Sequence, residues 1–155
     1  LVGVINLQGR GHMHEGELHS NPFKMADQLV TDMRVSTPAI VVDLHAEATS
    51  EKVAMGWYLD GRVSVVAGAH THVPTADGRI LPKGTAYGSD LGMVGPANSV
   101  IGVEIDDVLT RFLDQTPQRL RVALKGPVSF NSVLFDVDEA TGRATSVARL
   151  DRLVQ

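Results

Sequence analysis

Two short apolar runs in this chain stop at histidines, and they limit its fold more than any other feature. Residues 39–44 lead into His45, and residues 63–69 lead into His70 and His72. Short runs rich in β-branched residues are typical of buried strands in a parallel sheet. Ligands and metals bind at the carboxyl ends of such strands. If the two strands are neighbours, about 4.8 Å apart, three imidazoles meet at one edge of the sheet, and the pattern predicts a metal site.

The pair His70 and His72 carries more weight in this prediction than His45. A lone histidine at a strand end is usually a hydrogen-bonded structural residue, and that interpretation stays open for His45. In an extended chain, residues i and i+2 point to the same side, so we expect the rings of His70 and His72 to lie together. Two protonated imidazoles repel, and a shared cation bound to their neutral forms relieves the repulsion. Spacing alone leaves the metal site and the structural role about equally supported.

Composition narrows the class of protein. The chain has 155 residues, 43% hydrophobic and 21% charged, which is ordinary for one globular domain. Its net charge of −4 and pI near 5.8, without a basic stripe, argue against binding to long nucleic acids or anionic membranes. No apolar stretch reaches the roughly 18 residues of a membrane-spanning helix. Because cysteine is absent, any metal is held by nitrogen and oxygen atoms, and we expect a cytoplasmic protein.

The order of predicted elements in the first half is β-α-β-α-β, which is typical of α/β proteins with a parallel sheet. An opening strand covers residues 1–7. Asn21 and Pro22 predict the start of a helix, with asparagine as its N-cap. A second helix is expected to be capped by Thr49 or Ser50.

The inner face of this second helix is predicted to consist of four residues, Val53, Ala54, Trp57 and Tyr58. Its two aromatic residues are able in principle to stack on a nucleotide base, but on an amphipathic helix we expect them in the core. Asp60-Gly61 is expected to end the helix.

The second half is expected to be mainly antiparallel. Asp77-Gly78 between short extended runs predicts a hairpin turn. A short helix follows, with Asp106 as its expected N-cap. The alternation of apolar and polar residues over 120–150, with a turn from Asp138 to Gly142, predicts an antiparallel meander packed on one face.

Two other segments resemble binding motifs. The loop over residues 8–20 contains His12, His14 and His19, and a His-x-His pair is able to bind adventitious metal. We expect no site there, because no strand holds those rings. Residues 84–95 contain several glycines but lack the strand, glycine-rich turn and helix order of a phosphate-binding loop. We expect this segment to border the site.

Four segments resemble a known family. They read VINLQGR at residues 4–10, DLHAEATSEK at 43–52, GAHTHVPTAD at 68–77 and ILPKGTAY at 80–87. Together they resemble the YmdB-like calcineurin-type metallophosphoesterases, and the similarity runs along essentially the whole chain. The Gly-x-His-x-His pattern at residues 68–72 is also similar to the last metal motif of the wider metallophosphoesterase superfamily.

The resemblance implies a fold and a chemistry. It implies a four-layer α/β/β/α sandwich with a dinuclear metal centre that hydrolyses phosphodiesters, with 2′,3′- and 3′,5′-cyclic nucleotides as the substrate class. His45 and His70 would bind one metal and His72 the other. Iron or manganese is the expected metal. Imidazole and carboxylate ligands accommodate several divalent ions, and which of them binds depends heavily on availability. Metal-binding imidazoles need acceptors that fix their tautomers. Asp43, Glu47 and Asp90 are candidates by closeness in the sequence only, and for each of them a solvated charge or a helix-end residue is at least as well supported.

The chain departs from the family pattern in one large respect. The earlier motifs, an Asp after the first strand, a Glu-Asn pair and an Asn-His pair, have no counterpart here. They would supply the bridging carboxylate, further ligands and the proposed catalytic acid. The missing motifs and the usual length of such a domain together predict that residues 1–155 are the C-terminal part of a single domain lacking roughly 100 N-terminal residues. We expect the intact protein to be a homo-oligomeric enzyme for small nucleotides, and this chain alone to contain no catalytic residue and to be inactive.

Two alternatives remain open. An amidohydrolase-type metal hydrolase also uses His-x-His at a strand end, but it predicts a β/α barrel, and the expected antiparallel C-terminal meander argues against it. The other alternative is a non-catalytic regulatory fragment whose histidines are vestigial. Metal content and phosphodiesterase assays on the intact protein separate these possibilities.

Overall fold

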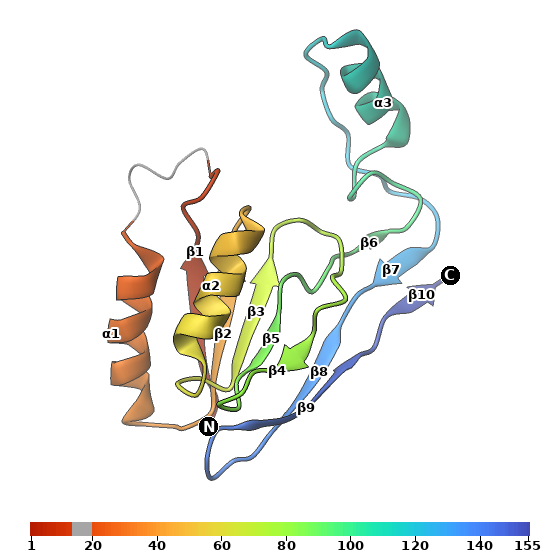
Figure 1. Ribbon diagram of the computed structural model, residues 1–155. Helices are drawn as coiled ribbons and strands as arrows, with labels where there is room; N and C mark the ends of the chain where they lie inside the picture. Colours follow the sequence, from red (N-terminus) through yellow and green to blue (C-terminus); the bar gives the residue numbers. More distant parts are fainter. Residues whose placement is uncertain (14–19) are drawn as a thin grey trace.

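The computed structural model of the chain describes residues 1–13 and 20–155, so the predictions for His14 and His19 lie outside the described residues. Its centre is a five-stranded sheet in the order β1-β2-β3-β5-β4 (Figure 1). Four strands run parallel and β4 runs antiparallel to β5. The strands are β1 (Gly3–Gln8), β2 (Ile40–His45), β3 (Val65–Ala69), β4 (Arg79–Ile80) and β5 (Ala86–Gly88). The predicted parallel β-α-β-α-β order is confirmed.

Two helices, α1 (Pro22–Arg34) and α2 (Thr49–Leu59), connect the first three strands and cover one face of the sheet. The predicted start of α1 is confirmed, because the Asn21 side chain accepts hydrogen bonds from the backbone N–H groups of Phe23 and Lys24. The predicted cap of α2 is wrong. Ala48 occupies the N-cap position without a side-chain hydrogen bond, and Thr49 is already helical.

The predicted inner face of α2 is also wrong. Of its four members only Val53 packs against the core, while Trp57 is 50% and Tyr58 is 42% exposed. The buried residues are instead at positions 52, 55, 56 and 59, which follow the i, i+3, i+4, i+7 spacing of one helix face. This face was hidden from a search for apolar residues because it includes Lys52 and Gly56.

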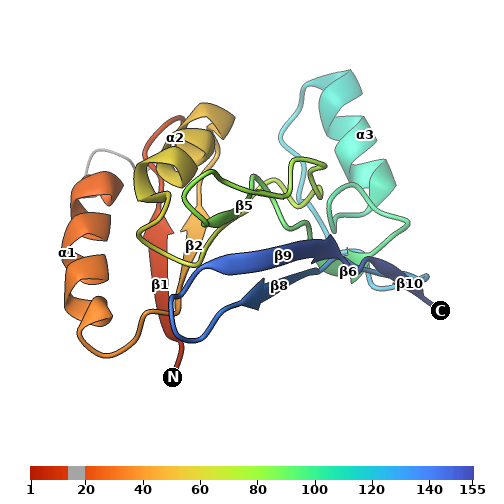
Figure 2. The same ribbon diagram turned by 60° about the horizontal axis from the view of Figure 1, so that its bottom comes forward.

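The core has two parts, one on each face of the sheet. Residues of β1, β2 and β3 pack against α1 and α2, with Ile40, Val42 and Leu44 fully buried. On the opposite face, Val65 and Ala67 pack against a hairpin formed by β8 (Val133–Val137) and β9 (Ala144–Arg149). Figure 2 shows the helices on one side of the sheet and this hairpin on the other. The described residues thus build helical, sheet and sheet layers; the second helical layer of the expected sandwich stays a prediction.

The C-terminal part is antiparallel, as predicted, but its strands are divided between two sheets and do not form one meander. β8 and β9 form an antiparallel pair, and β6 (Val94–Pro96), β7 (Val128–Phe130) and β10 (Arg152–Val154) form a three-stranded antiparallel sheet in the order β10-β7-β6. The predicted turn is also confirmed, with a 2.8 Å hydrogen bond from the Gly142 N–H to the Asp138 carbonyl.

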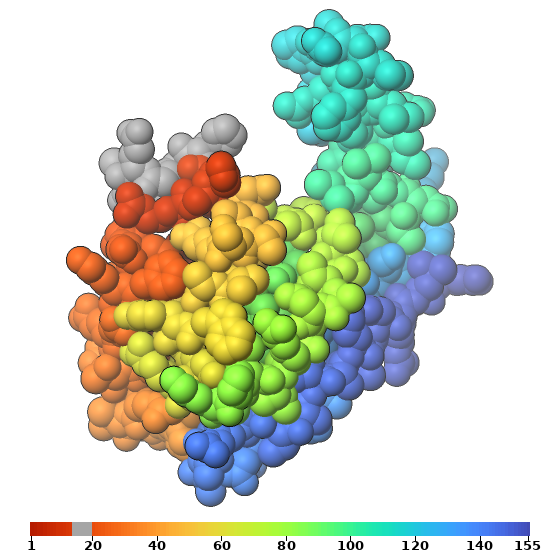
Figure 3. Space-filling model, viewed as in Figure 1, coloured from red at the N-terminus to blue at the C-terminus, as the bar shows by residue number. Residues whose placement is uncertain are grey.

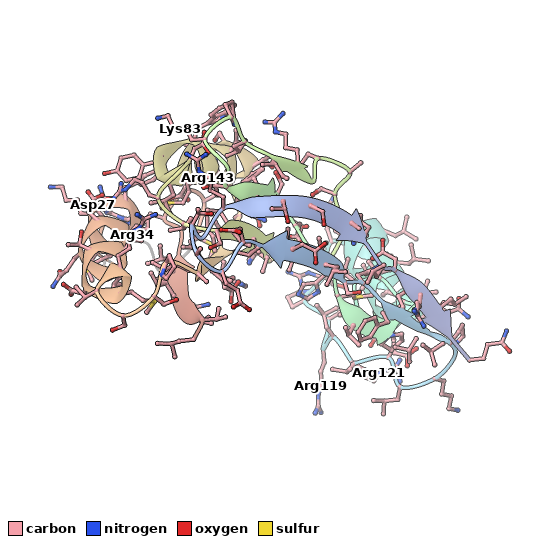
Figure 4. All side chains as sticks on the ribbon, turned by 90° about the horizontal axis from the view of Figure 1, so that it is seen from below. Asp27, Arg34, Lys83, Arg119, Arg121 and Arg143 are labelled. Carbon is pink, nitrogen blue, oxygen red and sulfur yellow. The ribbon has the colours of Figure 1, made fainter. Side chains whose placement is uncertain are left out.

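Residues 98–126 project from this body as an arm, which contains α3 (Ile105–Asp114) (Figures 1 and 3). Its helix starts after Glu104, so the prediction of Asp106 as N-cap is wrong. The Arg121 side chain makes an ion pair of 2.7 Å with Asp107, which links the segment after α3 back to that helix. The apolar residues predicted for the meander at 120–124 lie here. In Figure 4, Arg119 and Arg121 mark this end of the molecule, away from Lys83 and Arg143. Within residues 1–13 and 20–155, no helix is long and apolar enough to cross a membrane.

The hairpin turn predicted at Asp77-Gly78 is wrong. The antiparallel pair is β4 with β5, and the chain reverses between them over residues 81–85. The Asp77 carboxylate instead accepts hydrogen bonds from the hydroxyl groups of Thr75 and Ser89, each at 2.6 Å, and from the Ser89 N–H at 3.1 Å. Burial raises the pKa of Asp77, but these hydrogen bonds outweigh it and hold the pKa below its ordinary value of 3.8.

This shifted pKa predicts a contribution of Asp77 to acid stability. Because the folded-state pKa is depressed, the stabilisation is complete above the ordinary pKa and is lost as the pH falls through the folded-state pKa. We expect the free energy of unfolding of Asp77→Asn to fall less steeply than that of the wild type below about pH 4. Urea denaturation at a series of pH values measures this; parallel profiles for the two proteins below that pH would contradict it.

The close approach of α2 to β5 yields a second prediction. A Cβ atom added to Gly56 would lie 2.5 Å from Cδ2 of Tyr87, whose ring is buried. Overpacking of this kind costs about 1–3 kcal/mol, while the better helix propensity of alanine returns at most about 1 kcal/mol. We expect Gly56→Ala to lower the free energy of unfolding by about 1 kcal/mol. Gly88→Ala is the matched control, because a Cβ there meets nothing within 4 Å, and equal destabilisation by both would refute the steric explanation.

Candidate metal centre

His45 and His70 lie side by side at the carboxyl ends of neighbouring parallel strands. In the β2–β3 register, His45 is paired with Ala69, so His70 follows directly. Nε2 of His45 is 2.9 Å from Nδ1 of His70, and the two rings are 4.7 Å apart in a T-shaped arrangement. The two rings thus meet as the strand order predicts. Their role as metal ligands stays a prediction.

The other ring nitrogen of His70 faces a carboxylate. Nε2 of His70 lies 2.6 Å from Oε2 of Glu47, which follows β2. If Nε2 carries the proton and donates a hydrogen bond to Glu47, Nδ1 of the neutral ring presents a lone pair toward His45. A carboxylate behind a histidine is the usual arrangement at metal sites, where it fixes the tautomer and raises the basicity of the ring. Glu47 is therefore close enough to His70 to orient its ring, and that role stays a prediction.

The backbone at His70 and His72 is strained. β3 ends at Ala69, and the φ angles of His70 and His72 are +112° and +64°. Positive φ is disfavoured for residues other than glycine, and each such residue costs of order 1–3 kcal/mol. The segment is thus not extended, and the prediction that the two rings point to the same side of an extended chain is wrong. Strain of this kind is concentrated at functional sites.

The His72 ring contacts a different part of the chain. Its Nδ1 is 3.0 Å from the carbonyl oxygen of Ile101, at the base of the arm. Among the side chains of residues 1–13 and 20–155, no group of three from His, Asp and Glu is arranged to hold a metal ion. The structure therefore brings His45, His70 and Glu47 together and leaves His72 on the adjoining loop.

Asp90 contacts the backbone between the two strained histidines. Its side chain is buried, and its Oδ2 atom accepts hydrogen bonds from the Thr71 N–H at 2.9 Å and from Lys52 Nζ at 3.1 Å. Burial raises the pKa of Asp90, but hydrogen bonds from the backbone of Gly92 and Thr71 outweigh this and hold the pKa below its ordinary value. Asp90 thus bears a negative charge beneath the loop rather than contacting a histidine ring. Asp43, the third expected orienting group, accepts a 2.8 Å hydrogen bond from Asn6 instead.

Two residues of this region were missed in the sequence. The apolar pattern of the sequence does not indicate Lys52, although its helical spacing with Met55, Gly56 and Leu59 places it on the inner face of α2. Glu51 accepts hydrogen bonds from the N–H groups of Arg10, at 3.0 Å, and Gly11, at 2.9 Å. It thereby ties the segment after β1 to α2. Both lie in the DLHAEATSEK segment that carried the family resemblance.

The donor atoms fit part of a transition-metal shell. Imidazole nitrogens with a carboxylate nearby suit iron, manganese and zinc. Adjacent ligands about 2.1 Å from an octahedral ion are about 3 Å apart, and the 2.9 Å separation of the His45 and His70 nitrogens agrees with this value. Two imidazoles would fill only part of such a shell.

Comparisons with known proteins show which family the chain resembles. The model of the YmdB-like protein family matches residues 1–150. The 2′,3′-cyclic-nucleotide 2′-phosphodiesterase of Bacillus subtilis (strain 168) is 46% identical over 149 residues, which cover 96% of this chain and 55% of that protein. A putative phosphatase/phosphodiesterase of Mycoplasma pneumoniae is 42% identical over 123 residues, 79% of this chain and 43% of that protein. The chain thus spans about half the length of these curated relatives.

Two solved structures have the same fold. A hypothetical protein from Thermus thermophilus matches with a TM-score of 0.88 and 38% identity, over 98% of this chain and 57% of that one. A novel phosphatase from Mycoplasma pneumoniae matches with a TM-score of 0.88 and 36% identity, over 97% of this chain and 53% of that one. With nearly its whole length matched by one family model and by these relatives, the chain belongs to the YmdB-like family.

Proposed function

We propose that the protein hydrolyses phosphodiester bonds of 2′,3′- or 3′,5′-cyclic nucleotides at a centre of two metal ions, to which this chain contributes His45, His70 and His72. The observation that carries the proposal is the 2.9 Å pairing of His45 and His70 at the ends of two parallel strands. The cyclic-nucleotide and phosphodiesterase names of the curated relatives support the reaction class.

In this proposal His45 and His70 hold one metal, His72 holds the other, and iron or manganese occupies the site. When bound, the metals polarise the phosphate and supply a water of lowered pKa as nucleophile. Glu47 fixes the tautomer of His70 by accepting a hydrogen bond from Nε2–H, so that Nδ1 remains free to bind. The remaining ligands and the catalytic acid come from residues beyond these 155, which the greater length of the relatives allows.

The amidohydrolase alternative is not supported by the fold. It requires a closed β/α barrel, whereas the strands form an open sheet with antiparallel β4 at one edge. The vestigial alternative keeps the fold but predicts neither metal nor turnover. Assays of the protein as the cell produces it therefore decide between hydrolysis and a non-catalytic role.

The ligand roles are tested by removing single imidazoles. We expect His45→Ala and His72→Ala each to lower the rate of hydrolysis of bis-p-nitrophenyl phosphate and 2′,3′-cyclic AMP by more than about 100-fold, the upper limit for loss of a group behind a ligand. Bound metal, measured by elemental analysis, should fall in both. His14→Ala is the control and should change neither quantity. Equal losses in all three variants would show that the site is elsewhere, and a wild type without metal or turnover would refute the function.

The role of Glu47 is tested by Glu47→Gln, which keeps the size of the side chain and removes its charge. We expect an apparent metal affinity that is lower by about 10- to 100-fold, with activity recovering as Mn²⁺ is added. The dependence of kcat/KM on Mn²⁺ concentration measures this. A dependence identical to that of the wild type would mean that Glu47 is an ordinary surface charge.

A further inference from the structure

The loop that carries His70 and His72 needs support from outside its own sequence. Both histidines have positive φ angles, which residues with a side chain avoid unless surrounding contacts hold them there. Thr71 lies between them and has its N–H directed at a side chain rather than at the next strand. That hydrogen bond, 2.9 Å to Oδ2 of Asp90, is made by the residue between the two strained histidines.

Asp90 is itself fixed from several directions. Its carboxylate accepts from the Gly92 N–H at 2.9 Å and from Lys52 Nζ at 3.1 Å, so a helix and a loop both hold the side chain. Its backbone is fixed too, because its N–H donates to the Thr75 hydroxyl and its carbonyl accepts from the Thr75 N–H. Asp90 therefore contacts the histidine loop at Thr71 and again at Thr75, on both sides of His72.

Stability alone does not explain why the buried pair Lys52 and Asp90 is charged. The side chains of Lys52 and Asp90 are only 2% and 1% exposed, and buried ion pairs contribute little or no more to stability than well-packed apolar residues of the same size. The charges do matter for the positions of neighbouring groups, because an ionised carboxylate held by a lysine is a strong hydrogen-bond acceptor in a fixed place. The pair is therefore suited to holding the Thr71 N–H.

We infer that Asp90, held by Lys52, is a positioning residue that keeps the His70-Thr71-His72 loop in the conformation in which its histidines bind metal. The inference rests on the proposed metal-dependent function and adds to it a group that touches neither metal nor substrate. It predicts that loss of Asp90 weakens metal binding while the histidines themselves remain in the chain.

The test compares Asp90→Asn with Asp60→Asn in the complete protein. Asp60 is the matched control because it is also buried and accepts hydrogen bonds from backbone N–H groups, those of Lys83 and Thr85. It lies at the C-terminal end of α2. Mn²⁺ alone is titrated into the metal-free proteins, and free Mn²⁺ is followed by electron paramagnetic resonance. Thermal melting of each variant is recorded separately.

We expect both variants to have a lower melting temperature than the wild type. Only Asp90→Asn should bind Mn²⁺ about 10- to 100-fold more weakly, which is the usual effect of removing a group that orients a metal ligand. Its phosphodiesterase activity should recover at saturating Mn²⁺, which a general loss of structure would not allow. Equal Mn²⁺ affinity in the two variants, with a wild type that binds and hydrolyses, would overturn the positioning role only. A wild type that neither binds Mn²⁺ nor hydrolyses would overturn the proposed function and this inference with it.

Lys52→Met decides the matter if Asp90→Asn does not fold. It removes the ammonium group but leaves the carboxylate and its hydrogen bonds with Thr71 and Gly92. We expect a measurable loss of Mn²⁺ affinity that is smaller than that of Asp90→Asn where both can be measured, because Asp90 loses one of its three side-chain contacts. An affinity equal to that of the wild type would overturn the role assigned to the pair.

Discussion

The parallel pairing of β2 with β3 is the interaction on which the candidate site depends. Its register sets His45 opposite Ala69 and so places His70 beside His45. In a strand the side chains alternate between faces, so a slip of one residue would exchange the fully buried and the less buried residues of β2. The fully buried Val42 and Leu44 prevent that slip. The packing of the core and the meeting of the two imidazoles are therefore two results of one register.

A second constraint couples the helical layer to the loop beyond β3. Lys52 belongs to α2, Asp90 follows β5, and Thr71 lies beyond the end of β3. One carboxylate oxygen joins all three, in a region from which water is nearly excluded. Because a buried charge that loses its partner is strongly unfavourable, these three elements cannot separate independently. The position of the loop is thus linked to the packing of α2 on the sheet.

Local sequence signals predicted the elements well and their detailed faces poorly. The Asn21 cap, the strands ending at His45 and Ala69, and the turn from Asp138 to Gly142 rest on rules that act over a few residues. The inner face of α2 escaped because Lys52 is buried only through a partner 38 positions away. The positive φ of His70 and His72 could not be predicted for a similar reason, since positive φ is uncommon for residues other than glycine and a His-Thr-His sequence does not require it. Contacts distant in sequence decide such features, and spacing alone does not contain them.

The sole tryptophan of the chain stands on the outer side of α2, directly after Gly56. It is half exposed, and the Arg79 guanidinium lies 5.7 Å from the centre of its ring. Arg79 belongs to β4, so the indole bridges the helix and the edge of the sheet on the outside of the molecule. Tryptophan fluorescence will therefore report how firmly α2 is docked, and a change in its emission can appear before the buried core opens. Lys52 is on the same helix and contacts Asp90, which holds the histidine loop at Thr71. The fluorescence of this tryptophan is therefore a natural optical probe of the region around that loop.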